Sequence, residues 1–370
     1  MQIFAMVEPA FRHSLWCERV VNGMYTEAKR KKYAVRFVED WPAEYDALRA
    51  DGARMVVVVG TSISWIPRAL AEISARALRA ILVNYDSLGQ LSNHSVVRMD
   101  YVHAMRRVMG YCAHHGRRRM ALLGVNPNSS ADRIKEEFFL AALKGQGELE
   151  PQRHIFYNRG DVSACLARFL AAWQTYDALL CTNDLVAVFA LRELQKQGVA
   201  VPERMFLAGF GESVLSRQAQ PSITTVTLDH EQMGRQAVRL YAYLSRQSLP
   251  VTASIRVESR LVVRESTAGL ADAGHLFPQP DNGAVERVDF YRDGQVRELL
   301  ALESFYAGLD PLDEEILHAL ARDMSIEQIA EACQASVSTI GYRIRNMRLR
   351  AGASSRRELL QRVVWSLRGG

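Results

Sequence analysis

The chain has 370 residues, of which 48% are hydrophobic, so it is long and apolar enough to bury more than one core. Its net charge is +5, but from Arg343 onward eight arginines stand against one acidic residue, a local excess that suits a polyanion. The five cysteines are scattered and form no CxxC pair, and no apolar run approaches the roughly 18 residues of a membrane span. We therefore expect a cytoplasmic protein without metal, cofactor or membrane partner.

Short apolar runs alternate with helical patterns over the first 265 residues. Strands are expected at residues 2–7, 34–38, 55–60 and 80–84, with helices at 14–31, 41–50 and 66–76. A second series continues with helices at 102–115, 133–144, 162–174 and 184–197, and strands at 119–124, 152–157, 178–181 and 206–209. Alternation of helices with strands rich in Val and Ile is typical of parallel sheets covered on both faces, so the pattern predicts two α/β units.

Residues 266–308 form the junction to the rest of the chain. Its first part, AGLADAGHLFPQPDNGA, is rich in Gly, Pro and Asp and is predicted to be a linker. Around Asp293 and Gly294, residues 285–296 are predicted to form a small β-hairpin to which no function is assigned.

Helix-start signals recur in the last 60 residues. Asp310 precedes Pro311, Ser325 precedes Gln328 by three residues, Ser336 suits an N-cap, and Ser355 precedes Glu358 by three. These signals predict four helices within residues 309–370. The turn at residues 333–335 is so short that the second and third helices must cross steeply, as in a helix-turn-helix.

The third of these helices separates an apolar face from a cationic one. Ile340, Ile344 and Met347 fall on one side and the arginines on others, which predicts a helix that enters a DNA groove; the alternative is a solvated basic face. Residues near the helix start should lie nearest base edges, and Arg343, Arg348, Arg350 and Arg356 near phosphates. The candidate DNA-binding residues are Ser336, Ser338, Thr339, Tyr342, Arg343, Arg345, Arg348, Arg350 and Arg356.

The segment LDPLDEEILHALARDMSIEQIAEACQASVSTIGYRIRNMRLRAGASSRRELL resembles the LuxR type of helix-turn-helix. The shared features include the acidic first helix, the Ile329-Ala330 pair, and Glu358. Two positions depart from the family pattern, because Gly341 stands where a lysine is usual and Arg343 where a histidine is usual. The resemblance implies a DNA-binding domain at residues 309–370.

Residues 1–265 resemble the ligand-sensing domains of the LacI/GalR family. The resemblance rests on DYVHAMRRVMGYCAHHGRRRMALLG, SSADRIKEEF, YDALLCTNDLVAVFALRELQKQGVAVPERMFLAGFGE, PSITTVTLDHEQMGRQAVRLYAYL and SIRVESRLVVRES. It implies a two-lobed, type I periplasmic-binding-protein-like fold, with lobe 1 at about 1–98 and 229–250 and lobe 2 at about 104–224 and 254–265. Asp100 and residues 224–227 would be hinges. That family carries its DNA-binding domain at the N-terminus, so the present order is closer to that of xylose regulators.

Such a fold places a ligand in the cleft at the carboxyl ends of the strands. Glu8 and Trp16 would pair a carboxylate with an aromatic face for a sugar, although Trp16 could simply fill the lobe, and Arg133 matches the family's ligand-contacting arginine, although it could be a surface residue. In GFGE, Gly211 stands where the family usually has aspartate, and Glu212 could substitute. The candidate ligand-binding residues are Glu8, Trp16, Thr61, Tyr85, Asp100, Arg133, Asn183, Asp184 and Glu212.

The sequence is therefore interpreted as a transcription regulator that binds double-stranded DNA as a homodimer and responds to a small effector, a sugar or polyol. A cytoplasmic sugar-binding protein whose basic C-terminal helices bind a protein partner is the alternative. No GxSxG, Walker A, GxGxxG or HExxH pattern is present, so an enzyme is not expected.

Overall fold

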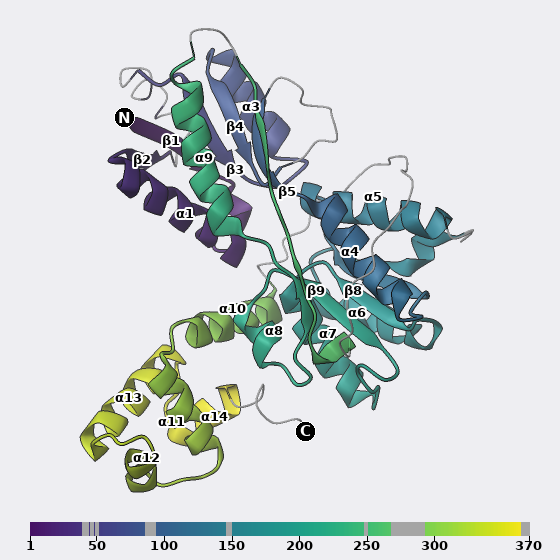
Figure 1. Cartoon of the computed structure of the whole chain (residues 1–370), viewed down its shortest axis with the longest axis vertical. Helices are drawn as coiled ribbons and strands as arrows, with labels where there is room; N and C mark the ends of the chain where they lie inside the picture. Colours follow the sequence, from purple (N-terminus) through teal and green to yellow (C-terminus); the bar gives the residue numbers. More distant parts are fainter. Residues whose placement is uncertain are drawn as a thin grey trace.

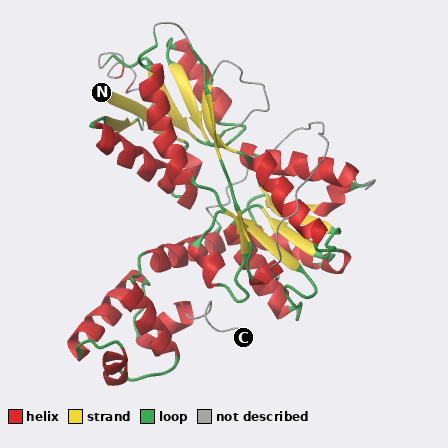
Figure 2. Cartoon of the chain, in the orientation of Figure 1, coloured by secondary structure: helices red, strands yellow, loops and turns green. Residues whose placement is uncertain are grey.

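Two six-stranded sheets form two lobes, which the computed structural model shows together with a group of helices at the C-terminus (Figure 1). The structure describes residues 1–38, 44, 48, 52–85, 94–145, 150–247, 251–267 and 293–363. The expected helix at 41–50 lies almost wholly outside these residues. Helices cover both sheets, and Figure 2 shows the strands enclosed between them.

The first sheet has the strand order β11-β5-β4-β3-β1-β2, and every pair in it is parallel. Its strands are β1 (Gln2–Val7), β2 (Ala34–Phe37), β3 (Met55–Val59), β4 (Arg79–Val83), β5 (Ser95–Met99) and β11 (Ser254–Val257). All five residues of β3 are buried, as expected of a central strand covered on both faces. The helices that the structure describes in this lobe are α1 (Leu15–Lys31), α3 (Ile66–Ala75) and α9 (His230–Leu244).

Helices α1 and α9 touch backbone to backbone because each carries a glycine at the contact. A Cβ at Gly23 would lie 1.9 Å from the carbonyl oxygen of Glu231, and one at Gly234 would lie 1.9 Å from that of Val20. Neither position can hold a larger residue without moving a helix. The start of α9, which borders the second lobe, is thereby held at a fixed distance from α1.

The second sheet has the order β12-β10-β9-β8-β6-β7 and is parallel except for the edge strand β12. Its strands are β6 (Met120–Val125), β7 (Ile155–Tyr157), β8 (Ala178–Cys181), β9 (Phe206–Phe210), β10 (Thr224–Val226) and β12 (Leu261–Val262). Its helices are α4 (Tyr101–His114), α5 (Ser130–Gly145), α6 (Val162–Leu170), α7 (Asp184–Lys196) and α8 (Val214–Gln218), with short 3-10 turns at Pro151–His154, Trp173–Thr175 and Glu265–Thr267. A further 3-10 turn, Pro9–Phe11, follows β1 in the first lobe. In the described ranges, no helix combines the length and apolarity that a membrane crossing requires.

The lobe boundaries differ from the expected ones at two places. Residues 254–257, assigned to lobe 2 from the sequence, form β11 in the first sheet, because Ser254 to Val257 pair in register with Val96 to Met99. Thr224 to Val226, expected to be a hinge, are strand β10, since they pair with Ala208 to Phe210. The second crossing therefore begins at Thr227, while Asp100 lies at the first crossing as expected.

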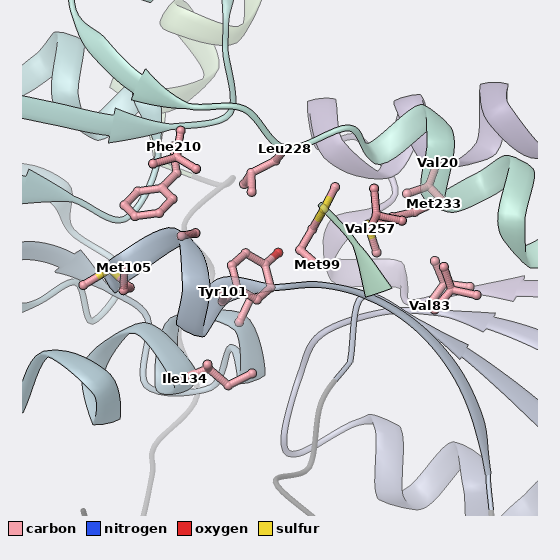
Figure 3. Packing of buried hydrophobic residues seen from close by; sticks show 14 of the residues in the cluster. Val20, Val83, Met99, Tyr101, Met105, Ile134, Phe210, Leu228, Met233 and Val257 are labelled. Carbon is pink, nitrogen blue, oxygen red and sulfur yellow. The ribbon is translucent and has the colours of Figure 1, made fainter. Parts of the chain in front are cut away.

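A hydrophobic cluster continues through the crossings from one lobe into the other. Met99, Tyr101, Leu228 and Val257 come from all three crossing segments and meet in this cluster, as Figure 3 shows. The lobes are thus joined by packed side chains as well as by the chain itself. This packing limits the paths along which one lobe can move relative to the other.

Within residues 293–363, five helices follow the second lobe: α10 (Gly294–Ala307), α11 (Pro311–Ala321), α12 (Ile326–Ala332), α13 (Val337–Arg350) and α14 (Arg356–Val363). The last four occur where the capping signals indicated. Asp310 and Ser325 each form a capping box, and the hydroxyl of Ser336 accepts a hydrogen bond from the Thr339 amide. Ile316, Ile329, Ile340 and Leu359 bring one side of each helix into a common core.

Asp293 and Gly294 begin a helix, and the hairpin prediction is wrong for these residues. The Asp293 carboxylate accepts hydrogen bonds from the amides of Gln295 and Val296, which makes it the N-cap of α10. Val296 and Leu299 then pack into the core that α10 shares with the second lobe. Residues 285–292 lie outside the described part of the chain. In Figure 1, α10 lies between the second lobe and the last four helices.

Candidate functional site

A cavity of about 130 Å³ lies between the two lobes. Strand ends and helix starts of both sheets contribute to its wall, as expected for paired parallel sheets. Its apolar side chains include Phe11, Leu15, Trp16, Tyr101, Leu185, Phe210 and Leu228. Its polar and charged side chains include Arg19, Thr61, Asn84, Asn126, Ser129, Asp132, Lys135, Thr182, Asn183, Asp184, Ser213 and His230.

The lobes touch each other at one side of the cavity. The amide of Ser130 donates to the carbonyl of Thr61 at 2.8 Å, and the amide of Ile63 donates to the carbonyl of Asn128 at 2.8 Å. The Thr61 hydroxyl also lies 3.2 Å from the hydroxyls of Ser129 and Ser130. These contacts join the loop after β3 to the start of α5, so the cavity is bordered by a bridge between the lobes.

Glu8 accepts hydrogen bonds from the first-lobe side of this bridge and lies outside the cavity lining. Its side chain is 2% exposed, and its Oε2 accepts hydrogen bonds from the amides of Thr61 and Ser62, both at 3.0 Å. Burial raises the pKa of Glu8, and these hydrogen bonds act against the rise. Glu8 therefore positions Thr61, which does line the cavity.

Lys135 supplies a buried cation to the cavity. It is 3% exposed, and its Nζ donates to Oδ1 of Asp132 and to the carbonyl of Thr182, both at 2.9 Å. The same Nζ lies 5.0 Å from the ring centre of Tyr101 and 5.1 Å from that of Phe210, within cation–π range. The ammonium is thus fixed between two aromatic rings of the wall.

Arg133 lies outside the cavity lining, unlike its neighbour Lys135. The Arg133 Nη2 atom is 3.7 Å from Oε1 of Glu137. Asp132 and Lys135 are three residues apart on α5 and share one helix face, while residue 133 points about 100° away from residue 132. That spacing was the signal by which the sequence could have indicated Lys135.

Asn183 and Asp184 line the cavity, and each also supports the backbone. The Asn183 side chain caps α7 by accepting from the Val186 amide at 2.9 Å. Asp184 is buried and accepts from the Ser213 amide at 2.7 Å and from the Thr225 hydroxyl at 2.6 Å. Burial raises the pKa of Asp184. Asn183 thus stabilises the start of its own helix, and Asp184 ties the cavity wall to β10 and to the start of α8.

Trp16, Arg19 and His230 form the wall contributed by α1 and α9. The rings of Trp16 and His230 are 6.1 Å apart, and Nη1 of Arg19 donates to the Gly211 carbonyl at 3.3 Å. Burial lowers the pKa of His230 to about 3, and the positive charges of Arg19 and Lys135 lower it further. The imidazole is therefore neutral near neutral pH. Sequence reasoning singled out neither Arg19 nor His230.

Three further candidates lie outside the cavity lining. Tyr85 is buried in the first-lobe core. Asp100 caps α4 by accepting from the His103 amide at 3.1 Å and pairs with Arg256 at 3.2 Å. Glu212 follows Gly211, whose φ of +133° favours glycine, and its carboxylate pairs with Arg264 instead of facing the cavity.

One face of α13 is exposed to solvent. Val337 is 50% exposed, Tyr342 is 67% exposed and Leu349 is 70% exposed, and Ser338 and Arg345 are also exposed. Ser338, Tyr342, Arg345 and Leu349 follow one another at steps of three or four residues, so they form one stripe along the helix, and Val337 lies beside its start. Ser336 caps the helix, and its hydroxyl lies 2.8 Å from those of Ser338 and Thr339.

Four of the predicted DNA-binding arginines contact other parts of the same chain. Arg343 pairs with Asp310 at 2.6 Å and with Asp313 at 2.8 Å, which lowers the pKa of Asp310. Arg350 donates to the carbonyls of Gly308 at 2.7 Å and Phe305 at 3.0 Å. Arg348 donates to the Ser354 carbonyl, and Arg356 to the Met324 carbonyl. These arginines tie the helices together, whereas Arg345 lies in the exposed stripe.

The two lobes have the fold of a periplasmic-binding-protein-like domain. Residues 109–267 match the family model of the periplasmic binding protein-like domain. The fold is similar to that of a putative LacI transcriptional regulator from Bacillus cereus subsp. cytotoxis, at TM-score 0.64 and 18% identity over 73% of this chain and 100% of the other. It is also similar to the regulator CelR in complex with cellobiose, at TM-score 0.62 and 20% identity over 72% of this chain and 84% of the other.

Among curated proteins, the chain is similar to DNA-binding regulators of the LacI/GalR type. It is 27% identical to the HTH-type regulator YvdE of Bacillus subtilis over 44% of this chain and 51% of the relative. It is 23% identical to the regulator GalS of Salmonella typhimurium over 67% of this chain and 70% of the relative. The chain thus spans about half the length of YvdE. Both of these similar proteins are HTH-type transcriptional regulators.

Proposed function

We propose that the protein is a cytoplasmic transcription regulator that binds specific double-stranded DNA sequences and responds to a small effector, a sugar or sugar derivative. The observation that carries the proposal is the cavity between two lobes of a LacI-like sensing fold, in a chain that also presents the exposed face of α13. Effector binding would change the placement of the C-terminal helices within a dimer.

The chemistry of the cavity supports a polyhydroxylated effector. Trp16, Tyr101 and Phe210 offer aromatic faces, and Asn84 and Asn126 offer amide donors and acceptors. Flat apolar faces suit the C–H surface of a sugar ring, and amides suit its hydroxyls. Similar folds occur in CelR with cellobiose and in a LacI-family regulator from Enterococcus faecium with ribose.

The arrangement of α12 and α13 supports DNA binding. Three residues, Cys333 to Ala335, separate α12 from the N-cap of α13, and Gln334 turns the chain with a φ of 50°. This short turn and the exposed start of α13 fit the LuxR-type helix-turn-helix that the sequence resembles. Tyr342 and Arg345 would then face base edges.

A duplex selection from a random library, using the full chain, tests DNA binding. We expect one preferred sequence, whose affinity falls with salt. Arg345→Ala should cost about 1 to 3 kcal/mol of discrimination at one base pair. Arg297→Ala removes an exposed charge from α10 and should leave discrimination unchanged. Equal binding to all duplexes by the wild type would contradict the proposal and favour a protein partner for the basic helices.

Thermal-shift measurements test the effector separately. Monosaccharides, sugar acids and polyols are screened together with cellobiose and ribose. A molecule that binds only the folded state at 100 times its dissociation constant stabilises the protein by about 2.7 kcal/mol. The absence of a shift with every one of these compounds would contradict a sugar-class effector.

A further inference from the structure

A short linking segment, residues 211–215, lies between the cavity and helix α10. Each of its residues has a backbone group held by a side chain from another element. On the cavity side, the Gly211 carbonyl accepts from Arg19 at 3.3 Å, and the Ser213 amide donates to Asp184 at 2.7 Å. Both Arg19 and Asp184 line the cavity. The Glu212 amide donates to the Thr225 hydroxyl at 3.3 Å, and Thr225 is itself bonded to Asp184.

On its other side, the linking segment is held by Glu303 of α10. Oε1 of Glu303 accepts from the Val214 amide at 2.7 Å, and Oε2 accepts from the Leu215 amide at 2.8 Å. Glu303 is 1% exposed, although it belongs to a helix that follows the second lobe in the chain. A carboxylate bonded to two amides at a helix start is well placed, because those amides have no partner within the helix. Helix α10 is therefore hydrogen-bonded to the linking segment through Glu303.

Glu303 also faces a cation from the first lobe. Nη2 of Arg19 lies 3.8 Å from its Oε1. Arg19 is on α1, whereas the linking segment belongs to the second lobe. A small movement of one lobe relative to the other therefore changes the Arg19–Glu303 distance. Burial raises the pKa of Glu303 and the charge of Arg19 lowers it.

The far end of α10 is bonded to α13 and α14. The Arg350 guanidinium, at the end of α13, donates to the carbonyls of Phe305 and Gly308 and lies 5.7 Å from the Phe305 ring centre. The Tyr306 hydroxyl donates to the carbonyl of Val363 in α14 at 2.6 Å. A displacement of α10 would consequently also move α13, the helix that carries the exposed stripe.

We propose that the linking segment transmits the occupancy of the cavity to α10, and that Glu303 is the residue through which α10 receives it. This proposal rests on the proposed function, since it assigns the regulation of the same site. An effector that bonds Arg19 or Asp184 competes for the groups that hold residues 211–213. When those bonds are lost, residues 211–213 shift. The shift alters the Arg19–Glu303 distance and the hydrogen bonds from the Val214 and Leu215 amides to Glu303, and so the position of α10.

The variant that tests the proposal is Glu303→Gln, with Glu298→Gln as its matched control. Glutamine has nearly the same shape, but its NH₂ group cannot accept a hydrogen bond from an amide, so one of the two bonds to the linking segment is lost. Glu298 is on the same helix and exposed, and its substitution removes an equal charge. Glu303→Asp, which keeps the charge on a shorter side chain, serves if Glu303→Gln unfolds.

The first measurement is amide hydrogen exchange on the full chain without effector or DNA. Glu303→Gln should raise exchange about tenfold or more at Val214 and Leu215 and should also raise it within residues 294–307. Glu298→Gln should leave residues 211–215 as in the wild type. Unchanged exchange in residues 211–215 for Glu303→Gln would overturn the proposal.

The second measurement is the coupling between small molecule and DNA, with cellobiose and ribose as separate probes. For a probe that shifts the wild-type melting temperature, we expect its addition to change wild-type affinity for the selected duplex about fivefold or more. Glu303→Gln should bind the probe and the duplex as the wild type does. In this variant, however, the probe should change the affinity for the duplex by less than about twofold. If the probe changes the duplex affinity of Glu303→Gln as much as that of the wild type, the proposal is overturned.

Failure of the proposed function gives a different result. The wild type itself would then show no thermal shift or no duplex preference. Hydrogen exchange needs neither the small molecule nor the duplex. It would still decide whether the hydrogen bonds of Glu303 hold α10 against the linking segment.

Discussion

His230 is a neutral histidine of the cavity wall because burial, and then the charges of Arg19 and Lys135, depress its pKa to about 3 from 6.5. Between these two pH values the unfolded chain binds a proton that the folded chain does not. The contribution of His230 to the free energy of unfolding should therefore be complete above pH 6.5 and decline as the pH falls toward 3.

Denaturant unfolding at several pH values between these limits checks this expectation. His230→Gln should show a weaker loss of stability on acidification than the wild type, because it lacks the titrating group. His103→Gln removes an exposed histidine of α4 and should follow the wild-type curve. Parallel curves for wild type and His230→Gln would refute the assignment.

Lys135, rather than Arg133, should be the cation of α5 that contacts the effector. Lys135→Met keeps the length of the stem and removes the ammonium, so we expect at least a tenfold loss of effector affinity, or about 1.4 kcal/mol. Arg133→Ala, whose guanidinium lies toward Glu137, should change affinity less. Titration calorimetry with an effector found by thermal shift measures both. An effect confined to Arg133→Ala would reverse the assignment.

The contact between α10 and α13 depends on the small size of Gly308. A Cβ there would lie 1.9 Å from Nη2 of Arg350, so Gly308→Ala must displace that guanidinium from the two carbonyls at the end of α10. The loss should be about 1 to 2 kcal/mol of unfolding free energy. Denaturant titration of the full chain measures it.

Gly294→Ala is the control for this substitution, since it replaces the glycine at the other end of α10. A Cβ at Gly294 meets nothing within 4 Å, so alanine there should leave stability unchanged or raise it by up to about 1 kcal/mol. Equal effects of the two substitutions would show that the Arg350 contact adds no stability.

For the whole molecule, we expect a homodimer on DNA. One recognition helix reads too few base pairs for useful specificity, and two half-sites double the sequence that is read. Sedimentation at micromolar concentration with and without the selected duplex measures the state. A monomer in both conditions would contradict this expectation.

Most helices and strands were predictable from the sequence because their causes are local. Buried strands show as runs such as MVVVV, and helix starts show as Ser325 with Gln328 or as Ser336. Local signals also explain the error at Asp293 and Gly294, because an Asp-Gly pair suits a hairpin turn and a helix start alike. Packing of Val296 and Leu299 against the second lobe selects the helix.

The sequence by itself determined the α/β alternation, the four C-terminal helices and a general region for the cavity at the strand ends. Only the tertiary structure decided that Lys135 faces the cavity and Arg133 does not, that Ser254 to Val257 extend the first sheet, and that Arg343 pairs with Asp310. Glu303 meets Val214 across 89 residues of chain. Such contacts depend on which distant residues the fold brings together, and no local pattern in the sequence records that.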